Sequence, residues 1–311
     1  MAAPLPSPCP GRLRQDRGAG RRRPRGRENT PCGSQAQQDS GQQVAGGAAT
    51  TAPEAQPDSA LRRRPPRAII SPSPRRKGGR CVGVRESVRQ VLSRMEDAAD
   101  RALRDPAEIT LVAVTKTVPV KRIIEAVEAG VTAIGENRVQ EAGRKFEELD
   151  LPVEKHLVGH LQTNKVRDAL GLFDLIQSVD SVRLAREISH RADAAGKTAR
   201  VLVEVNTSGE GTKNGLPPDE AAAAVEQMAG LPGLRVEGLM TVGAFLPDPE
   251  DVRPCFRRLR ALRDEIEERV VPGVSMAHLS MGMTNDFEVA VEEGATLVRV
   301  GRAIFGERPT D

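Results

Sequence analysis

Lys116 is the residue in this sequence that is best placed for covalent chemistry. It ends an apolar run, Thr110–Lys116, which reads as a buried strand. Side chains alternate along a strand, so Val112, Val114 and Lys116 share one face. An amine at such a strand end loses solvation, which lowers its pKa and makes it nucleophilic toward aldehydes. Taken alone, Lys116 is better interpreted as a lysine that reaches the solvent from a strand end, because most lysines are solvated.

Two segments near the end of the chain combine hydroxyl groups, glycines and an arginine. The first runs from Leu279 to Thr284 and the second from Val298 to Gly306. Hydroxyl groups, exposed backbone N–H groups and a guanidinium are suitable donors for a phosphate dianion. Arg299 shares strand parity with Gly301, so it can point toward the same mouth as Lys116. An aldehyde-reactive lysine beside a phosphate cup indicates a ligand with both groups, and pyridoxal 5′-phosphate has that shape.

Eight strand candidates alternate with amphipathic helical stretches from Val84 onward. They are Thr110–Lys116, Ala133–Asn137, His156–Leu161, Leu175–Val179, Ala199–Asn206, Val236–Val242, Val274–Met281 and Thr296–Gly301. Eight such units in about 228 residues predict a (β/α)8 barrel, whose active sites form at the carboxyl ends of the strands. A doubly wound open sheet is the alternative. It would place glycines after the first strand, and the turn from Thr117 to Pro119 has none.

Four segments in this order resemble the pyridoxal phosphate homeostasis proteins, and the resemblance runs from about Val84 to Arg308. The segments are Val112–Lys116, Gly135–Glu141, His156–Lys165 and Leu279–Thr284. The resemblance implies a single (β/α)8 domain of the alanine racemase N-terminal type over residues 84–311. It also implies that the cofactor, pyridoxal 5′-phosphate, is held as an internal aldimine and that the protein serves the intracellular homeostasis of this cofactor.

The resemblance also implies roles for individual residues. It implies that Lys116 forms the aldimine and that residues 280–284 and 299–301 contact the phosphate. It also implies that Asn137 and Met240 line the pocket of the pyridine ring. One departure is Arg302, where a small hydroxyl residue is common in relatives. The expected cofactor-binding residues are therefore Lys116, Asn137, Met240, Ser280, Gly282, Thr284, Arg299 and Gly301.

Other polar residues have less specific interpretations. His156 and His160 are four apart on a strand, hence about 13 Å apart, which is too far for one metal ion. We expect His156 to be a satisfied core histidine and His160 to form hydrogen bonds at the pocket rim. Lys213 lies in a polar loop and could gate the mouth or accept the aldehyde transiently. Glu136 and Asp286 are expected at helix starts, near amide dipoles.

A protein that binds and releases the cofactor is one interpretation, and two classes of enzyme are the alternatives. A two-base racemase resembling alanine racemase takes its second proton carrier from a tyrosine in an extra β-domain, whereas this chain has no tyrosine and ends at Asp311. An aldolase would need an acid or base beside Lys116, and no carboxylate is evident there. We therefore expect a cofactor-handling protein with no catalytic residues and no metal. The alternative is a racemase-like enzyme with weak or unidentified activity.

The first part of the chain differs from the rest in composition. Residues 1–80 hold 16 basic and 5 acidic residues and 12 of the 23 prolines, without an aromatic residue. Residues 1–83 are therefore expected to be a disordered basic tail rich in Pro, Gly and Arg. Two functional alternatives are an organelle transit peptide and a nucleic-acid arm, and a third is upstream sequence translated from too early a start codon.

The expected partners and location follow from the composition and the resemblance together. Four widely spaced cysteines and no long apolar run favour a reduced, cytoplasmic location away from membranes. The expected partners are pyridoxal phosphate and apo-enzymes that receive it. No nucleic acid is expected, and a monomer is implied by the resemblance.

Overall fold

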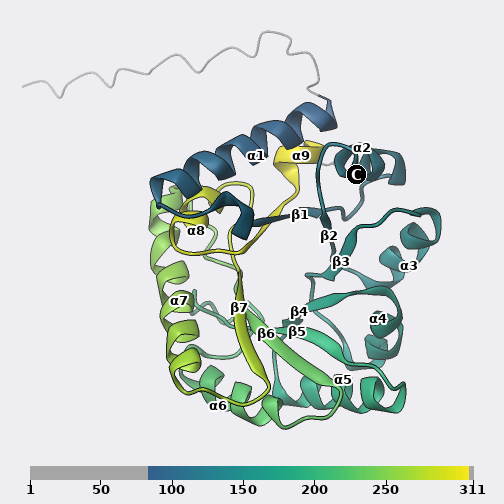
Figure 1. The fold of residues 1–311 in the computed structure, drawn as a ribbon, viewed down its shortest axis with the longest axis vertical. Coiled ribbons are helices and arrows are strands. Elements are labelled where there is room, and N and C mark those ends of the chain that lie inside the picture. Colours follow the sequence, from purple (N-terminus) through teal and green to yellow (C-terminus); the bar gives the residue numbers. More distant parts are fainter. Residues whose placement is uncertain (1–82, 308–311) are drawn as a thin grey trace, which may run out of the picture. The chain divides into compact units, whose positions relative to one another are not determined.

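Eight parallel strands form a closed barrel in the computed structural model, which describes residues 83–307 (Figure 1). Each strand pairs with the next along the chain, and β8 pairs with β1. The strands are β1 (Thr110–Val114), β2 (Ala133–Glu136), β3 (Glu154–Leu157), β4 (Leu175–Val179), β5 (Ala199–Glu204), β6 (Leu234–Met240), β7 (Val274–Ser280) and β8 (Leu297–Val300). The predicted barrel is therefore confirmed. The predicted tail lies outside the described residues, except for Gly83.

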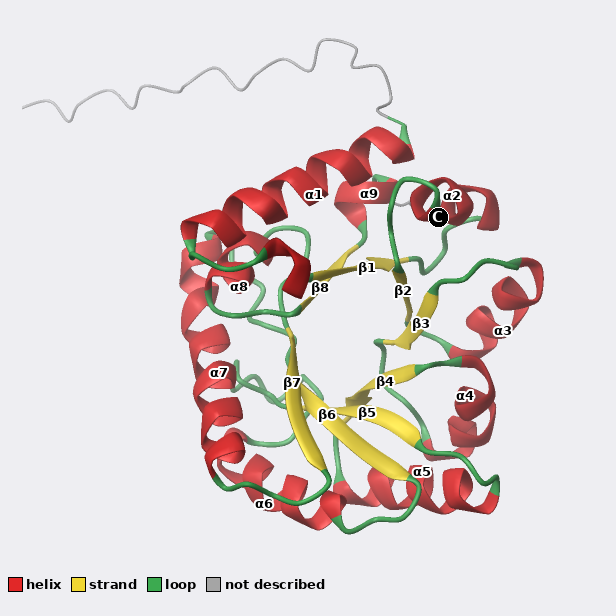
Figure 2. Cartoon of the chain, in the orientation of Figure 1, coloured by secondary structure: helices red, strands yellow, loops and turns green. Residues whose placement is uncertain are grey.

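Helices surround the barrel on its outside (Figure 2). They are α1 (Val84–Arg101), α2 (Val120–Val127), α3 (Val139–Glu148), α4 (Val166–Leu172), α5 (Val182–Ala194), α6 (Pro218–Ala229), α7 (Arg253–Glu268), α8 (Phe287–Glu292) and α9 (Arg302–Phe305). Three short 3-10 helices lie at Pro106–Glu108, Thr163–Lys165 and Pro249–Val252. Helix α1 precedes the first strand and packs against α2, α8 and α9, which covers the outer face near the β8–β1 seam.

The outer core lies between the strands and the helices. Helix α7 shows how the sequence builds it, because its buried residues recur at the helical period. They are Phe256, Leu259, Leu262 and Ile266. Burying a side chain of this kind typically contributes about 1.5–3 kcal/mol, so the face of α7 that packs on the barrel stabilises the outer layer.

The barrel interior has an apolar layer of its own, formed by inward-facing residues of six strands. It consists of Val112, Ala133, Leu175, Leu202, Met240 and Leu297. Because strand side chains alternate, the next inward positions toward the carboxyl ends lie above this layer. Two residues after Val112 and Leu202 in β1 and β5, and after Leu297 in β8, these inward positions are Val114, Glu204 and Arg299. The apolar layer is thus the floor beneath the mouth of the barrel.

Several strand ends differ from the prediction by a few residues. Strand β1 ends at Val114, so Lys116 lies in the turn after the strand and not within it. Strand β3 ends at Leu157, four residues earlier than expected. A Cβ on Gly159 would lie 2.4 Å from the backbone oxygen of Asn137, so the chain after β3 crosses the end of β2 too closely for the ladder to continue.

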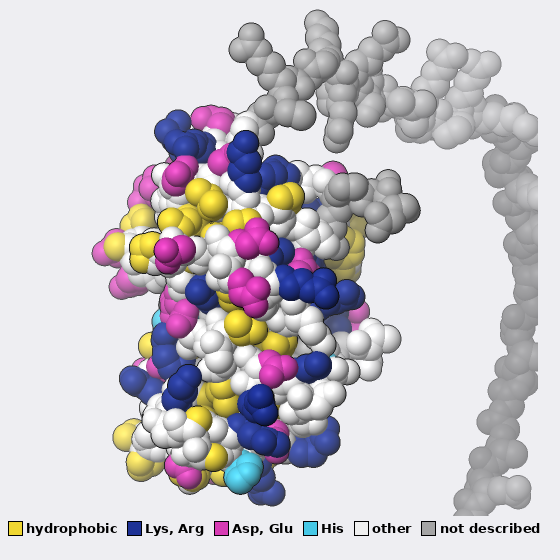
Figure 3. Space-filling view, turned by 90° about the vertical axis from the view of Figure 1, so that its right-hand side faces the viewer, with side chains coloured by type: hydrophobic (Ala, Val, Ile, Leu, Met, Phe, Trp, Pro, Cys, Tyr) yellow, Lys and Arg dark blue, Asp and Glu magenta, His cyan; other side chains and the backbone are white. Residues whose placement is uncertain are grey.

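In residues 83–307, no helix combines the length and the apolar character that crossing a bilayer requires. Figure 3 shows the face that lies on the right in Figure 1, which carries α2, α3 and α4. On this face basic and acidic side chains are interspersed.

Candidate functional site

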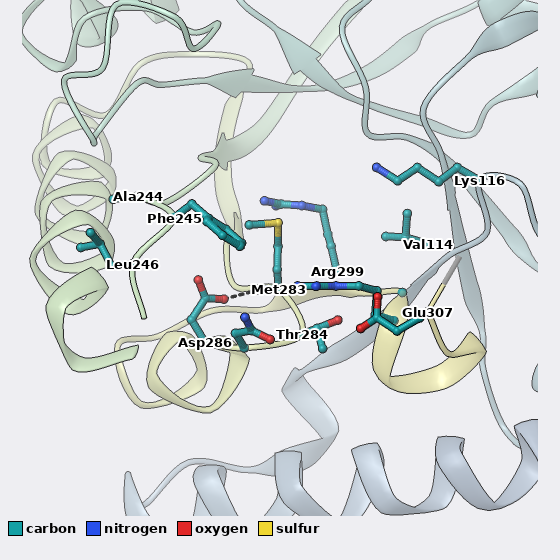
Figure 4. A pocket seen from close by; sticks show the side chains of 13 residues that line it. Val114, Lys116, Ala244, Phe245, Leu246, Met283, Thr284, Asp286, Arg299 and Glu307 are labelled. Carbon is teal, nitrogen blue, oxygen red and sulfur yellow. Dashed lines mark hydrogen bonds between the residues drawn. The ribbon is translucent and has the colours of Figure 1, made fainter. Parts of the chain in front are cut away.

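A pocket of about 480 Å³ opens at the carboxyl end of the barrel. Its lining comes from the ends of β1 and β8 and from the segments that follow β6 and β7. Figure 4 shows Lys116 and Phe245 on opposite sides of this pocket, with Met283 and Arg299 between them. A second cavity of about 260 Å³ adjoins the first and shares Lys116 with it. The lysine predicted to react with an aldehyde therefore borders both cavities.

Arg299 is buried inside the barrel, where it is held by two hydrogen bonds. Its Nη1 donates to the hydroxyl of Ser280, and its Nη2 donates to the backbone oxygen of Thr241 at 2.7 Å. The Ser280 hydroxyl in turn donates to Oε1 of Gln177 at 2.6 Å. The amide of Gln177 pairs with Nδ1 of His156 at 2.7 Å. A chain of buried hydrogen bonds thus runs from the guanidinium across the barrel to β3 and fixes its direction.

Two carboxyl groups surround this guanidinium without a direct hydrogen bond to it. Burial lowers the pKa of Arg299 to about 10, against the opposing charges of Glu204 and Asp286, so the side chain stays protonated at neutral pH. Burial raises the pKa of Glu204 to about 7, and the charge of Asp180 adds to the shift. Burial also raises the pKa of Asp286. Near neutral pH the charge around Arg299 therefore depends on the state of Glu204.

Gly282 and Gly301 allow the backbone to pass closely at the ends of β7 and β8. Gly282 has φ +89°, and a Cβ there would lie 2.5 Å from the Cβ of Ala290. Its carbonyl accepts a hydrogen bond from the N–H of Arg299 at 3.0 Å. Gly301 lines the pocket directly before α9. The two segments predicted to form a phosphate cup are therefore bonded to each other at the pocket.

Four of the eight predicted site residues line the pocket, and the other four do not. Lys116, Thr284, Arg299 and Gly301 line it. Of the others, Met240 belongs to the apolar floor and Ser280 bonds to Arg299 from below. Gly282 supports the β7–α8 segment, and Asn137 is half-buried directly after β2. Their roles toward a ligand stay predictions.

The remaining predicted residues have clear places. His156 is buried, with Nε2 3.2 Å from the Glu154 carboxylate, and His160 lies at the surface with Nδ1 3.0 Å from Asp180. Lys213 bonds to Glu210 at 2.7 Å and to the Gly243 backbone oxygen at 2.8 Å. It fastens its loop to the segment after β6. In residues 83–307 no group of three or more His, Cys, Asp or Glu residues could hold a metal ion.

Of the two carboxylates expected at helix starts, only Asp286 is found at one. It precedes α8 and accepts a hydrogen bond from the N–H of Met283 at 2.5 Å. The expectation for Glu136 is wrong. Glu136 ends β2, faces away from the barrel interior and pairs with Lys145 of α3 at 2.7 Å. Lys145 supplies a fixed cation, which replaces the helix amides that sequence position suggested.

One wall of the pocket and the buried carboxyl of Glu204 were not predicted from the sequence. Ala244, Phe245 and Leu246 line the pocket from the segment after β6, and Phe245 is 75% exposed. The available signal was the mostly apolar run Val242–Pro247 directly after a strand end, because contiguous exposed apolar surface often indicates a binding site. Glu204 could have been found from its parity with Leu202 in a buried strand.

Comparisons with known proteins agree with this geometry. A sequence profile of the alanine racemase, N-terminal domain family matches residues 91–309. Over 224 residues the chain is 47% identical to the pyridoxal phosphate homeostasis protein of Aquifex aeolicus, which covers 72% of this chain and 97% of the relative. It is 40% identical over 240 residues to the human pyridoxal phosphate homeostasis protein, with 73% and 87% covered.

A solved structure of PipY from Synechococcus elongatus PCC7942 with PLP bound is also similar. It superimposes with a TM-score of 0.61 at 34% identity and covers 68% of this chain and all of that chain.

Proposed function

This chain belongs to the pyridoxal phosphate homeostasis protein family, and we propose that it binds pyridoxal 5′-phosphate through Lys116 and serves the intracellular homeostasis of this cofactor. The observation that carries the proposal is that Lys116 borders the same pocket as Arg299, Thr284 and Gly301. When bound, the cofactor supplies an aldehyde carbon that a lysine nitrogen can attack, with loss of the aldehyde oxygen as water together with both amine hydrogens.

The residues present in the pocket fit this cofactor. The donor set contains an amine, a buried guanidinium, a hydroxyl and the backbone beside a glycine, which suits an aldehyde and a phosphate. The apolar side chains of Val114, Met283 and Phe245 suit the faces of an aromatic ring. A volume of about 480 Å³ falls in the usual range for small-molecule sites, which is about 300–1,000 Å³.

Each side chain has a proposed task. Lys116 forms the covalent bond, and Arg299 with Thr284 and the Gly301 segment neutralises and positions the anionic end of the ligand. Ser280 keeps the guanidinium in place from beneath. Met240 and Asn137 bound the site from the floor and from the end of β2. Burial of Arg299 strengthens its interaction with an anion, because water does not compete for its donors.

We further propose that the protein is a carrier without catalytic turnover and that it acts as a cytoplasmic monomer which passes its cofactor to apo-enzymes. Support comes from the names of the relatives, which describe homeostasis and not a reaction. The sequence also lacks tyrosine, which serves as the second proton carrier in the racemase that shares this type of barrel.

A transfer experiment tests the carrier function. The loaded protein is mixed with an apo-enzyme that depends on pyridoxal phosphate, in the presence of a phosphatase that destroys free cofactor. Recovery of the apo-enzyme's activity under these conditions supports a carrier. In parallel, amino acids are incubated with the loaded protein in D2O, and deuterium incorporation at Cα is followed by NMR. Sustained exchange without transfer would overturn the carrier in favour of a racemase-like enzyme.

A further inference from the structure

Both peptide groups that flank Lys116 are held by one buried cluster outside the barrel. Nζ of Lys145 on α3 donates to the backbone oxygen of Thr115 at 2.6 Å. It also donates to Oε1 of Glu136 and to Oε1 of Glu141, each at 2.7 Å. An ammonium has three donors, and all three are used here, so the position of Nζ is fully determined.

The second peptide group is held from the other side of Lys116. The N–H of Thr117 donates to Oε1 of Glu141 at 2.5 Å, and the hydroxyl of Thr115 donates to Oε1 of Glu136 at 2.7 Å. The carbonyl before Lys116 and the amide after it are therefore bonded to a single cluster of Lys145, Glu136 and Glu141. The backbone of Lys116 lies between two fixed points.

The turn that this cluster holds is strained. Thr117 has φ +61°, a left-handed conformation that is unfavourable for a β-branched residue. Such strain costs about 1–3 kcal/mol and persists only where the surrounding structure imposes it. The hydrogen bond from the Thr117 amide to Glu141 is the side-chain contact that holds the turn in this conformation, beside the backbone bond from the Val118 N–H to the Thr115 oxygen. Without this bond the turn would relax, and the start of the Lys116 side chain would move with it.

Burial of this cluster is also energetically unfavourable. Glu136 is fully buried, the Lys145 side chain is only 12% exposed, and Oε2 of Glu136 has no hydrogen-bond partner. Burial raises the pKa of Glu136, which opposes the ionised form. Apolar residues often stabilise such a site better than buried ion pairs do. Stability alone is therefore a poor reason for this cluster, and its contacts to both sides of Lys116 provide another.

We propose that Lys145 is a positioning residue for Lys116: through Glu136 and Glu141 it fixes the β1–α2 turn and thereby sets where the Lys116 amine lies in the pocket. This inference rests on the proposed function, in which that amine captures an aldehyde. A displacement of about 1 Å at a reacting group can slow a reaction by about a hundredfold. The cluster thus controls how fast the protein captures its cofactor, although no atom of Lys145 lines the pocket.

The test compares Lys145→Met, Lys145→Arg and Arg253→Met with the unaltered full-length chain. Arg253, the first residue of α7, is the matched control because it is a cation of similar exposure, 17%. It binds Glu250 in the preceding 3-10 helix and Glu292 and Glu293 at the end of α8, away from β1. To measure the rate of covalent capture, each apo-protein is mixed with pyridoxal phosphate and the reaction is quenched with borohydride at set times. Intact mass spectrometry then gives the fraction of protein that carries the reduced cofactor. Amide exchange at Thr117 is measured on the apo-proteins.

We expect Lys145→Met to slow capture at least about tenfold and to speed amide exchange at Thr117. Lys145→Arg should restore most of the rate, and Arg253→Met should stay within about twofold of the unaltered chain while lowering its melting temperature. A folded Lys145→Met variant that captures at the original rate overturns the inference, as does an equal slowing in Arg253→Met. If Lys145→Met does not fold, Glu141→Ala decides, because its side chain is partly exposed.

Glu141→Ala removes the acceptor of the Thr117 amide, so slowing of about fivefold or more supports the inference and an unchanged rate refutes it. Failure of the proposed function has a different signature, because the unaltered chain would then form no adduct at all.

Discussion

The guanidinium of Arg299 donates to the hydroxyl of Ser280, so two residues that the sequence assigned to a phosphate are hydrogen-bonded to each other inside the barrel. The Ser280 hydroxyl donates its own hydrogen to Oε1 of Gln177. Ser280 therefore contributes to the pocket through Arg299, whose remaining N–H groups are directed by this contact. A charge-assisted hydrogen bond of this kind is about twice as strong as a neutral one.

Substitution of Ser280 tests this relationship. Ser280→Ala leaves Oε1 of Gln177 and one N–H of Arg299 without their partner in a fully buried place, so the free energy of unfolding should fall by about 1–3 kcal/mol. Urea unfolding of the apo-protein measures it. Thr284→Ala, at a half-buried position on the pocket lining, is the control and should cost less than about 1 kcal/mol. Equal losses in the two variants would mean that the Ser280 contact contributes little.

Arg299→Gln should weaken cofactor binding through loss of charge. Glutamine keeps some donors but loses the positive charge, so affinity for pyridoxal phosphate should fall by about 1.5–3 kcal/mol, which is about tenfold to a hundredfold in Kd. Phosphate-free pyridoxal should lose much less. Titration of the apo-protein with both ligands measures the difference. An equal loss for the two ligands, or no loss for either, would remove Arg299 from the phosphate contacts.

Glu204 should make the apo-protein less stable as the pH rises. Its pKa in the folded chain is about 7, raised by burial from an ordinary 4.5, so the folded state holds its proton more tightly than the unfolded state. The resulting cost is absent below pH 4.5, grows between 4.5 and 7 and is complete above 7. Glu204→Gln should therefore leave stability nearly unchanged at pH 5 and raise it by up to roughly 3 kcal/mol at pH 8.

Glu154 provides a control of the opposite sign. The contacts of its carboxylate with His156 and Arg200 lower its pKa to about 2, so its stabilisation is present above pH 4.5 and is lost only as the pH falls toward 2. Glu154→Gln should accordingly destabilise the protein at both pH 5 and pH 8. Unfolding by urea at the two pH values distinguishes the variants, and a pH-independent effect of Glu204→Gln would contradict the assignment.

Residues 84–311 should be sufficient for the fold and for cofactor binding. The composition changes near Gly83, and α1 begins at Val84 with its apolar face against α8 and α9. A chain that starts at Val84 should keep the melting temperature and the cofactor affinity of the full chain. Differential scanning calorimetry and cofactor titration compare the two. Loss of binding in the shorter chain alone would assign residues 1–83 a part in the site.

The sequence predicted the barrel well because each strand carries its own signal. Eight apolar runs separated by amphipathic helical stretches indicated the barrel. Strand parity put Arg299 on a face that can point into the barrel mouth, and the structure buries it inside the barrel. Strand ends were less accurate, because they depend on contacts such as the close approach of Gly159 to Asn137. No local pattern encodes such a crossing of two segments.

The contacts of Lys145 could not be read from the sequence. In α3 it is one of several charged residues, and most lysines on helices face solvent. Its role depends on Glu136 and on the turn around Thr117, which only the packing of α3 against β1 and β2 brings together. Phe245 was also difficult to identify from the sequence, because an exposed aromatic side chain indicates a binding site only when the pocket beside it is known.

Covalent attachment at Lys116 is the central claim, and mass spectrometry tests it most directly. The protein is incubated with pyridoxal phosphate and reduced with borohydride. Its intact mass is then measured, and a digest is analysed by peptide mapping. We predict a mass increase of one reduced cofactor, located on the peptide that contains Lys116, absent in Lys116→Ala and retained in Lys213→Ala. An adduct on Lys213, or an unchanged mass after reduction, would contradict the account.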